Sequence, residues 1–265
     1  MQDLATAAIG VLTTADAAAK AKAARDAAVA WRSGTLAANG IKMPPERPAR
    51  PARPELRRPG DMPRRKAGGN AEKRIALLHA LAHIELNAID LAWDMIARFS
   101  TADLPRAFLD DWVRVGDEEA LHFTMLCERL AEFGAAYGDL PAHDGLWLAA
   151  EETAHDLLAR LAIVPLVLEA RGLDVTPATI ADFNRAGDTA SAAALEVIYR
   201  DEIGHVATGK RWFDHVAGMR GLDPAATWQD LVRRHFRGRL KPPFNRVARD
   251  AAGFAADYYE PLATG

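Results

Sequence analysis

Four long segments of the chain repeat apolar residues at alternating spacings of three and four, which is the period of an amphipathic helix. No stretch shows the apolar–polar alternation of a half-buried strand. The sequence therefore predicts an all-α protein in which four long helices pack as an antiparallel bundle. The four predicted helices cover about 71–99, 105–134, 145–171 and 189–217.

Each of the four apolar stripes is interrupted near its middle by a carboxylate. The first and third stripes carry a single glutamate, and the second and fourth carry Glu-x-x-His. Residues three apart on a helix project from the same face, so each pair can bind one metal ion. This order is the ligand set of the ferritin-like di-iron and di-manganese carboxylate proteins. The predicted ligands are Glu85, Glu119, His122, Glu169, Glu202 and His205.

The spacing of these glutamates agrees with two helical hairpins. Glu85 and Glu119 are 34 residues apart, and Glu169 and Glu202 are 33 apart. In each pair the connection between the helices contains the midpoint, which brings the two carboxylates to one level. A buried salt-bridge network would instead need Arg or Lys on the same stripes, and none lies near these positions. We therefore expect two metal ions, with iron preferred and manganese or mixed Mn/Fe as alternatives.

Two aspartates are candidates to support the ligands. Asp117 and Asp201 lie beside the Glu-x-x-His pairs and could accept a hydrogen bond from the second nitrogen of a ligand histidine. Solvated charge is the alternative for each. Pro165 lies four residues before Glu169 and is expected to kink the third helix.

Other histidines fit the centre less well. Glu152-x-x-His155 has the same spacing, but His155 is 14 residues before Glu169, or about 21 Å along a helix. We expect it to be a structural histidine or to lie at the end of the bundle. His79 and His83 fall off the face of Glu85, and we expect both to be structural.

The flanking segments differ in composition from the bundle. The expected division is an alanine-rich helical segment over 1–43, a Pro/Arg-rich extended arm over 44–70, the bundle over 71–218 and a C-terminal extension over 219–265. The arm is either a strap on the bundle or a basic surface for an anion such as tRNA. The tail over 229–249 is basic as well.

Charge and cysteine content set broad limits. The formal net charge of -3 demands neither nucleic acid nor membrane as a partner. Cys127 is the single cysteine, so the metal ligands are histidines and carboxylates rather than thiolates. A basic start and a continuous apolar segment of the kind found in a secretory leader are missing near Met1. We expect a cytoplasmic protein.

Several stretches resemble an uncharacterised bacterial family described as ferritin-like with a domain of unknown function. They are ALLHALAHIELNAIDLAWD, DDWVRVGDEEALHF, YGDLPAHDGLW, VPLVLEARGLDVTP and IYRDEIGHV. The resemblance runs from about residue 44 to 250, and it implies the bundle and the six ligands. The tRNA-modifying di-iron hydroxylases are a more distant likeness.

Three functions are compatible with these features. The preferred one is an O2-dependent oxidase or hydroxylase of a small organic substrate, with Trp93, Trp112, Phe123 and Trp212 shaping a pocket or forming plain core. The second is iron handling of the ferroxidase type. The third is a protein that binds or modifies nucleic acid through its basic arm. A homodimer is compatible with each.

Overall fold

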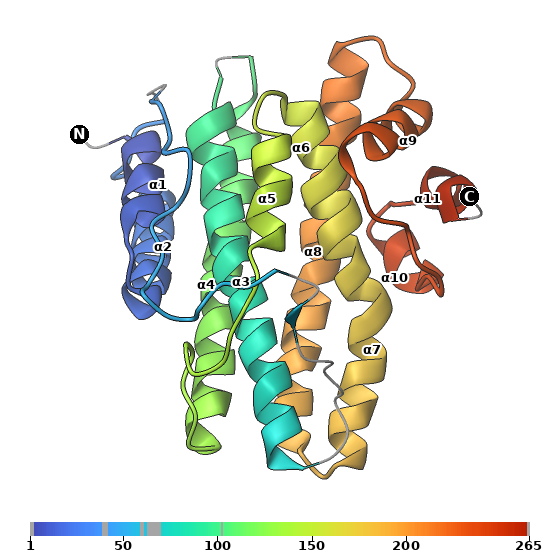
Figure 1. The fold of residues 1–265 in the computed structure, drawn as a ribbon. Helices are drawn as coiled ribbons and strands as arrows, with labels where there is room; N and C mark the ends of the chain where they lie inside the picture. Colours follow the sequence, from blue (N-terminus) through green and yellow to red (C-terminus); the bar gives the residue numbers. More distant parts are fainter. Residues whose placement is uncertain (1–2, 39–41, 59–60, 63–69, 102, 264–265) are drawn as a thin grey trace. The chain divides into compact units, whose positions relative to one another are not determined.

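The computed structural model describes residues 3–38, 42–58, 61–62, 70–101 and 103–263. In this part of the chain the regular structure is helical, and the β-type pairing consists of two isolated bridges (Figure 1). The all-α prediction is therefore confirmed. The helices fall into two compact units. Unit 1 comprises Met1–Trp147 with Arg185–Ala194, and unit 2 comprises Leu148–Asn184 with Leu195–Gly265.

Unit 1 is built on a hairpin of two long helices. Its helices α3 and α4 lie side by side and antiparallel, while α1 packs on α3 and α2 packs on α4 (Figure 1). The alanine-rich N-terminal segment therefore forms two helices that lie against the hairpin. The helices are α1 (Leu4–Thr13), α2 (Ala17–Arg32), α3 (Ala71–Phe99) and α4 (Arg106–Glu132).

Local signals set the ends of the hairpin helices. The side chain of Asn70 caps α3 by accepting a hydrogen bond from the backbone N–H of Lys73. Pro105 precedes the first residue of α4, where its missing N–H leaves no helical hydrogen bond unmade. After α4, Gly134 adopts a φ of 72°, which a residue with a side chain rarely adopts. The predicted bounds of both helices are correct to within two residues.

The described part of the Pro/Arg-rich arm is strapped to unit 1. The Arg50 guanidinium contacts the carboxylate of Asp90 on α3 at 2.9 Å, and Arg47 forms an ion pair with Asp144. Two of the arm's arginines are thus neutralised by carboxylates of the same unit, as a strap requires. The basic residues 64–66 lie outside the described residues.

Unit 2 contains the remaining helices. Within it, α9 packs against α6 and α11, and α10 packs against α11. Tyr258 and Tyr259 of α11 are buried beside Phe254, so they do anchor the tail. The elements are α5 (Gly145–Glu152, which begins in unit 1), α6 (Leu157–Ile163), the π-helical segment η2 (Val164–Glu169), α7 (Ala170–Arg185), α8 (Thr189–Met219, which also begins in unit 1), α9 (Pro224–His235), α10 (Arg246–Ala251) and α11 (Ala256–Ala263).

The predicted third helix begins at the expected residue, Gly145, but its continuity and its end are wrong. It is interrupted after α5, and α7 continues through Gly172 and Pro177 to Arg185. A proline cannot donate to the carbonyl four residues earlier, which here belongs to Leu173. That carbonyl instead accepts a hydrogen bond of 3.0 Å from the side-chain amide of Asn245. A partner far along the chain thus compensates for the local break signal.

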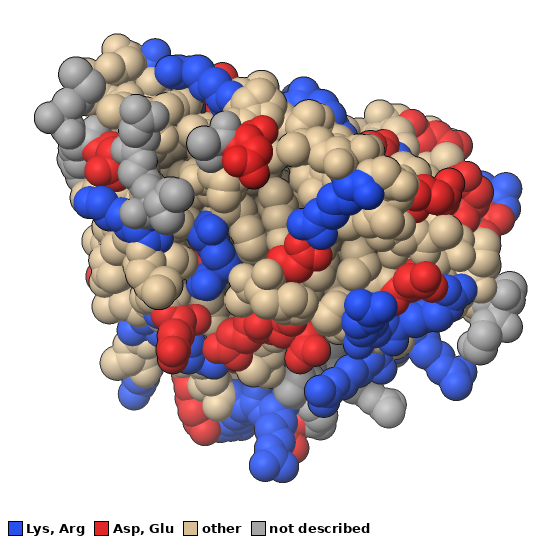
Figure 2. All heavy atoms as spheres, turned by 90° about the horizontal axis from the view of Figure 1, so that it is seen from above, with Lys and Arg blue, Asp and Glu red and all other residues tan. Residues whose placement is uncertain are grey.

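Surface charge is mixed in sign. On the face shown in Figure 2, acidic and basic side chains are interspersed. Part of the basic tail is neutralised within unit 2, where Arg233 contacts Asp230 at 2.8 Å and Arg246 forms an ion pair with Glu260. The tail is thus less positive locally than its sequence alone suggests.

Helix α3 is unusually apolar for its length. By length and composition it is the one helix in the described ranges that could cross a membrane, and 72% of its most apolar window is buried inside the structure. The core helix of a soluble protein passes the same test. The apolar composition is therefore weak evidence for a membrane span.

Candidate metal centre

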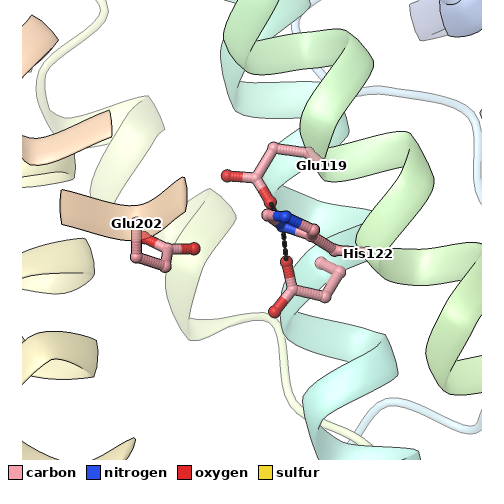
Figure 3. A group of neighbouring side chains, drawn as sticks. Glu119, His122 and Glu202 are labelled. Atoms are coloured by element: carbon pink, nitrogen blue, oxygen red, sulfur yellow. Dashed lines mark ion pairs between the residues drawn. The ribbon is translucent and has the colours of Figure 1, made fainter. Parts of the chain in front are cut away.

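The hairpin of unit 1 brings three of the predicted ligands together. Glu119 and His122 share one face of α4 (Figure 3), and Glu85 reaches them from α3. The Nδ1 atom of His122 lies 3.4 Å from a carboxylate oxygen of Glu85 and 3.4 Å from one of Glu119. Each residue offers a ligand atom within 4.8 Å of the others. The hairpin register predicted from the sequence spacing is thus correct here.

All three side chains are removed from water. Glu119 and His122 have no exposed surface, and Glu85 is 4% exposed. An isolated buried carboxylate costs several kcal/mol unless a partner compensates for its lost hydration. Two carboxylates and an imidazole that are buried in contact therefore need either shared protons or a cation.

The pKa values of Glu85 and His122 reflect the cost of burying these charges together. Burial and the neighbouring charge of Glu119 raise the pKa of Glu85 well above its usual range. Burial disfavours the charged form of His122, yet its hydrogen bonds with Glu119 and Glu85 raise its pKa to about 11. Without a metal, protons neutralise the group. A divalent cation can take their place, and His with carboxylates is a donor set that suits iron, manganese or zinc.

A close helix contact lies one turn before Glu119. A Cβ atom built on Gly116 of α4 would lie 2.6 Å from Nε1 of Trp93 on α3. The indole of Trp93 therefore occupies the space that any side chain at position 116 would need. Trp93 and Trp112 are both buried, so in unit 1 these two aromatics are core.

Unit 2 repeats the pairing of glutamate and histidine. On α8, the Nδ1 atom of His205 lies 3.7 Å from a carboxylate oxygen of Glu202, and His205 is fully buried. Glu169 is the last residue of η2. The three predicted ligands of this unit thus lie on two elements, one of which is π-helical.

The π-helical segment replaces the kink expected at Pro165. It spans Val164–Glu169, and such segments are rare and frequent at functional sites. Its proline faces α8 closely, because a Cβ atom on Gly209 would lie 2.3 Å from the Cβ of Pro165. Trp228 of α9 donates a hydrogen bond of 3.1 Å to the carbonyl of Ala162 just before the segment.

The two supporting aspartates have arginine partners. Arg32 of α2 donates a hydrogen bond of 2.8 Å to Asp117, and Arg25 also contacts it at 3.4 Å. Asp201 lies 3.3 Å from Nε of the adjacent Arg200. These contacts tie Asp117 to the N-terminal helices. Support of a ligand histidine by either aspartate stays a prediction.

His79 and His83 make structural contacts. The Nε2 atom of His79 accepts a hydrogen bond of 2.9 Å from the backbone N–H of Gly138. Nδ1 of His83 lies 2.8 Å from the hydroxyl of Tyr137, and its Nε2 lies 3.0 Å from the carbonyl of His143. Both rings therefore hold the connection that follows α4.

Sequence reasoning missed a buried ionic network beside the centre. Asp90, on the helix that carries Glu85, is fully buried and contacts Lys20 of α2 at 2.5 Å and Arg50 of the arm. The cations come from outside the predicted bundle stripes. The signal available in the sequence was Asp90 itself, a charged residue five positions after Glu85 in a mostly apolar helix.

The hollow described in unit 1 does not reach the three ligands. It measures about 620 Å³ and lies between α2 and α4, with Phe123, Cys127 and Tyr137 among its lining residues. None of the three ligands lines it. Phe123 does follow His122 directly in α4, so the hollow adjoins the ligand-bearing helix.

Comparison with known proteins places the chain in a family. The model of a family described as "Protein of unknown function (DUF455)" matches residues 13–260. The chain belongs to the DUF455 family. A Haemophilus influenzae protein described as uncharacterized is 43% identical over 209 residues, which cover 77% of this chain and 72% of that relative. No solved structure matches the chain.

The DUF455 match is wider than the resemblance seen in the sequence. It starts at residue 13, within α1, whereas the resemblance started at about residue 44. The N-terminal helix α2, the arm and the tail all belong to the family's common region. The contacts of Arg32, Lys20 and Arg50 with α3 and α4 are therefore made by parts of one family unit.

Proposed function

We propose that this DUF455 protein is a di-metal carboxylate protein with a ferritin-like four-helix bundle, and that iron is its metal. The observation that carries the proposal is the buried contact of Glu85, Glu119 and His122 in unit 1. Two buried carboxylates this close to one another repel, and a cation bound between them and the imidazole would offset that repulsion. The i, i+3 spacing on α4 suits two ligands of one ion.

The sequence pattern supports three further ligands. Glu202 and His205 on α8 repeat the i, i+3 pair, and Glu169 provides the fourth carboxylate. The burial of His205 and the spacing of the Glu202–His205 pair support the proposal, as does the order of the six ligands along the chain. The centre would then hold one histidine per metal ion and four carboxylates.

We propose that the reaction is an O2-dependent oxidation or hydroxylation of an organic substrate. Two bound irons would supply the electrons and the oxygen chemistry, while the chain's own residues bind, orient and exclude water. Burial of the three ligands in unit 1 supports a site protected from water.

Metal content is the first test. The protein purified from iron-supplied cells is expected to contain close to two irons per chain by mass spectrometry. Glu119→Gln removes a ligand charge while keeping the shape of the side chain, and should lose at least half of the iron. Glu118→Gln is the matched control. The Glu118 carboxylate is next to Glu119 in the sequence, but it is partly exposed and pairs with Arg114 at 2.8 Å. Equal iron in both variants, with helix content retained, would refute the proposal.

Oxygen consumption separates the two metal-based functions. Ferrous-loaded protein that consumes O2 in proportion to added organic substrate is an oxidase or hydroxylase. Protein that instead turns over excess ferrous ion without a substrate handles iron, the alternative function. Nucleic-acid binding by the arm has less support, because Arg47 and Arg50 are already paired within unit 1.

A further inference from the structure

A second group of histidines and a carboxylate lies in unit 2, apart from the six predicted ligands. Glu152 ends α5, His155 lies in the turn before α6, and His235 ends α9. The Nδ1 atom of His235 lies 3.7 Å from a carboxylate oxygen of Glu152. The rings of His155 and His235 have centroids 5.4 Å apart and planes inclined by 48°.

The buried member of this group has an unsatisfied polar atom. The side chain of His235 is 8% exposed, and its Nδ1 makes no hydrogen bond with any residue in the described part of the chain. A buried polar atom without a hydrogen bond costs about 1–3 kcal/mol. The atom faces Glu152, so a ligand held between them would remove this cost.

The neighbouring carboxylates are already occupied. Asp156 accepts two hydrogen bonds from Arg220, at 2.5 and 3.0 Å. Asp230 pairs with Arg233 at 2.8 Å. Glu152 is thus the acid of this neighbourhood that is left to face the imidazoles.

We propose that Glu152, His155 and His235 bind one divalent transition-metal ion of the Zn2+ class. Three protein ligands from histidine and carboxylate, with water in the fourth position, are a common zinc arrangement. The Glu152-x-x-His155 pair, which is too far from Glu169 to belong to the main centre, would supply two ligands, and His235 of α9 would supply the third.

The observed separations match such an ion. With a Zn–N distance of about 2.05 Å and about 1.1 Å from ring nitrogen to centroid, tetrahedral angles place two imidazole centroids about 5.2 Å apart. The observed value is 5.4 Å. The same angles place a ligand nitrogen and oxygen about 3.4 Å apart, against 3.7 Å for His235 and Glu152. The three residues do not offer ligand atoms that all lie within 4.8 Å of one another, so the exposed side chain of His155 must rotate to complete the site.

The bound ion would link two parts of unit 2. It would join the turn between α5 and α6 to the end of α9, just before the basic tail. The site uses none of the six ligands of the proposed di-metal centre, so it neither needs that centre nor fails with it.

Zinc titration of a chain whose main centre is disabled tests the site. In a Glu119→Gln/Glu202→Gln background stripped with chelator, calorimetry should show one Zn2+ per chain. Cobalt substitution should give the intense visible bands of a tetrahedral ion. His155→Ala and Glu152→Gln are expected to weaken Zn2+ binding at least tenfold. His215→Ala is the matched control, an exposed histidine of the same unit.

Each outcome decides the question. His155 is exposed, so its variant should fold, and helix content by circular dichroism verifies this; His235→Ala then adds the buried ligand. Loss of binding in the cluster variants but not in His215→Ala supports the site. Absence of Zn2+ binding, or binding that the cluster variants retain, overturns it and leaves the group as an imidazole–carboxylate ion pair.

Discussion

Replacing Gly116 by alanine tests the close contact between α3 and α4. The added Cβ would lie 2.6 Å from Nε1 of Trp93 and 3.1 Å from its Cδ1, whereas unstrained contacts are about 3.5 Å. The indole must therefore move by roughly 0.9 Å. Trp93 is fully buried, and overpacking of this kind costs about 1–3 kcal/mol.

Helix propensity opposes this cost only in part. Alanine gains about 1 kcal/mol over glycine in a helix interior, so the net destabilisation of Gly116→Ala should be about 0–2 kcal/mol. Gly10→Ala is the matched control. It lies in α1 of the same unit and has nothing within 4 Å of its added Cβ, so it should raise stability by about 0.5–1 kcal/mol.

Urea denaturation followed by circular dichroism measures both variants. Because Gly116 lies one turn before Glu119, the displaced helices should also lower the iron content of the purified Gly116→Ala protein. Gly116→Ala that is stabilised as much as Gly10→Ala would refute the close packing described here. A destabilised variant with full iron content would separate the packing from the proposed centre.

The remaining predictions concern other packing and pairing contacts. Gly209→Ala should lower stability by about 1–3 kcal/mol in urea denaturation because its Cβ would meet the proline of η2, whereas Gly218→Ala, with nothing nearby, should be neutral or stabilising. Lys20→Met should cost about 3 kcal/mol in the same assay, since it leaves a buried aspartate with one cation fewer. The exposed Lys22→Met should change stability by less than about 0.5 kcal/mol. Asn245→Ala should cost about 1–2 kcal/mol and speed amide exchange in α7, because it removes the hydrogen bond to the Leu173 carbonyl, which has no helical donor at Pro177.

The sequence was sufficient for the hairpin of unit 1. The apolar stripes of α3 and α4 have the helical period, and their ends carry Asn70 and Gly134, so local signals and packing agree. The spacing of Glu85 and Glu119 then placed them at one level. This part of the centre was predictable because an antiparallel hairpin brings residues at equal distance from its turn, here Glu85 and Glu119, next to each other.

The sequence was insufficient where distant residues override local signals. The third helix was predicted to end at about 171, but α7 runs through Gly172 and Pro177 because Leu173 and Phe183 are buried and Asn245 completes the hydrogen bonding. The π-helical segment also escaped prediction, because its register depends on packing against α8 and α9. Periodicity measured on one helix carries no information about either partner.

The buried network around Asp90 was missed for a similar reason. Its cations, Lys20 and Arg50, come from α2 and the arm. On the sequence alone they read as surface charges of an alanine-rich helix and a proline-rich arm. Only the fold shows that one arm arginine neutralises a core aspartate.

The hydrogen bond from Asn245 to Leu173 has a consequence for the order of synthesis. The two residues are 72 positions apart, so at 5–20 residues per second the ribosome needs roughly 4–14 s to make the second after the first. During that interval α7 has an unmet carbonyl at its proline. The nascent helix that follows Glu169 can therefore reach its final form only after Asn245 has been made.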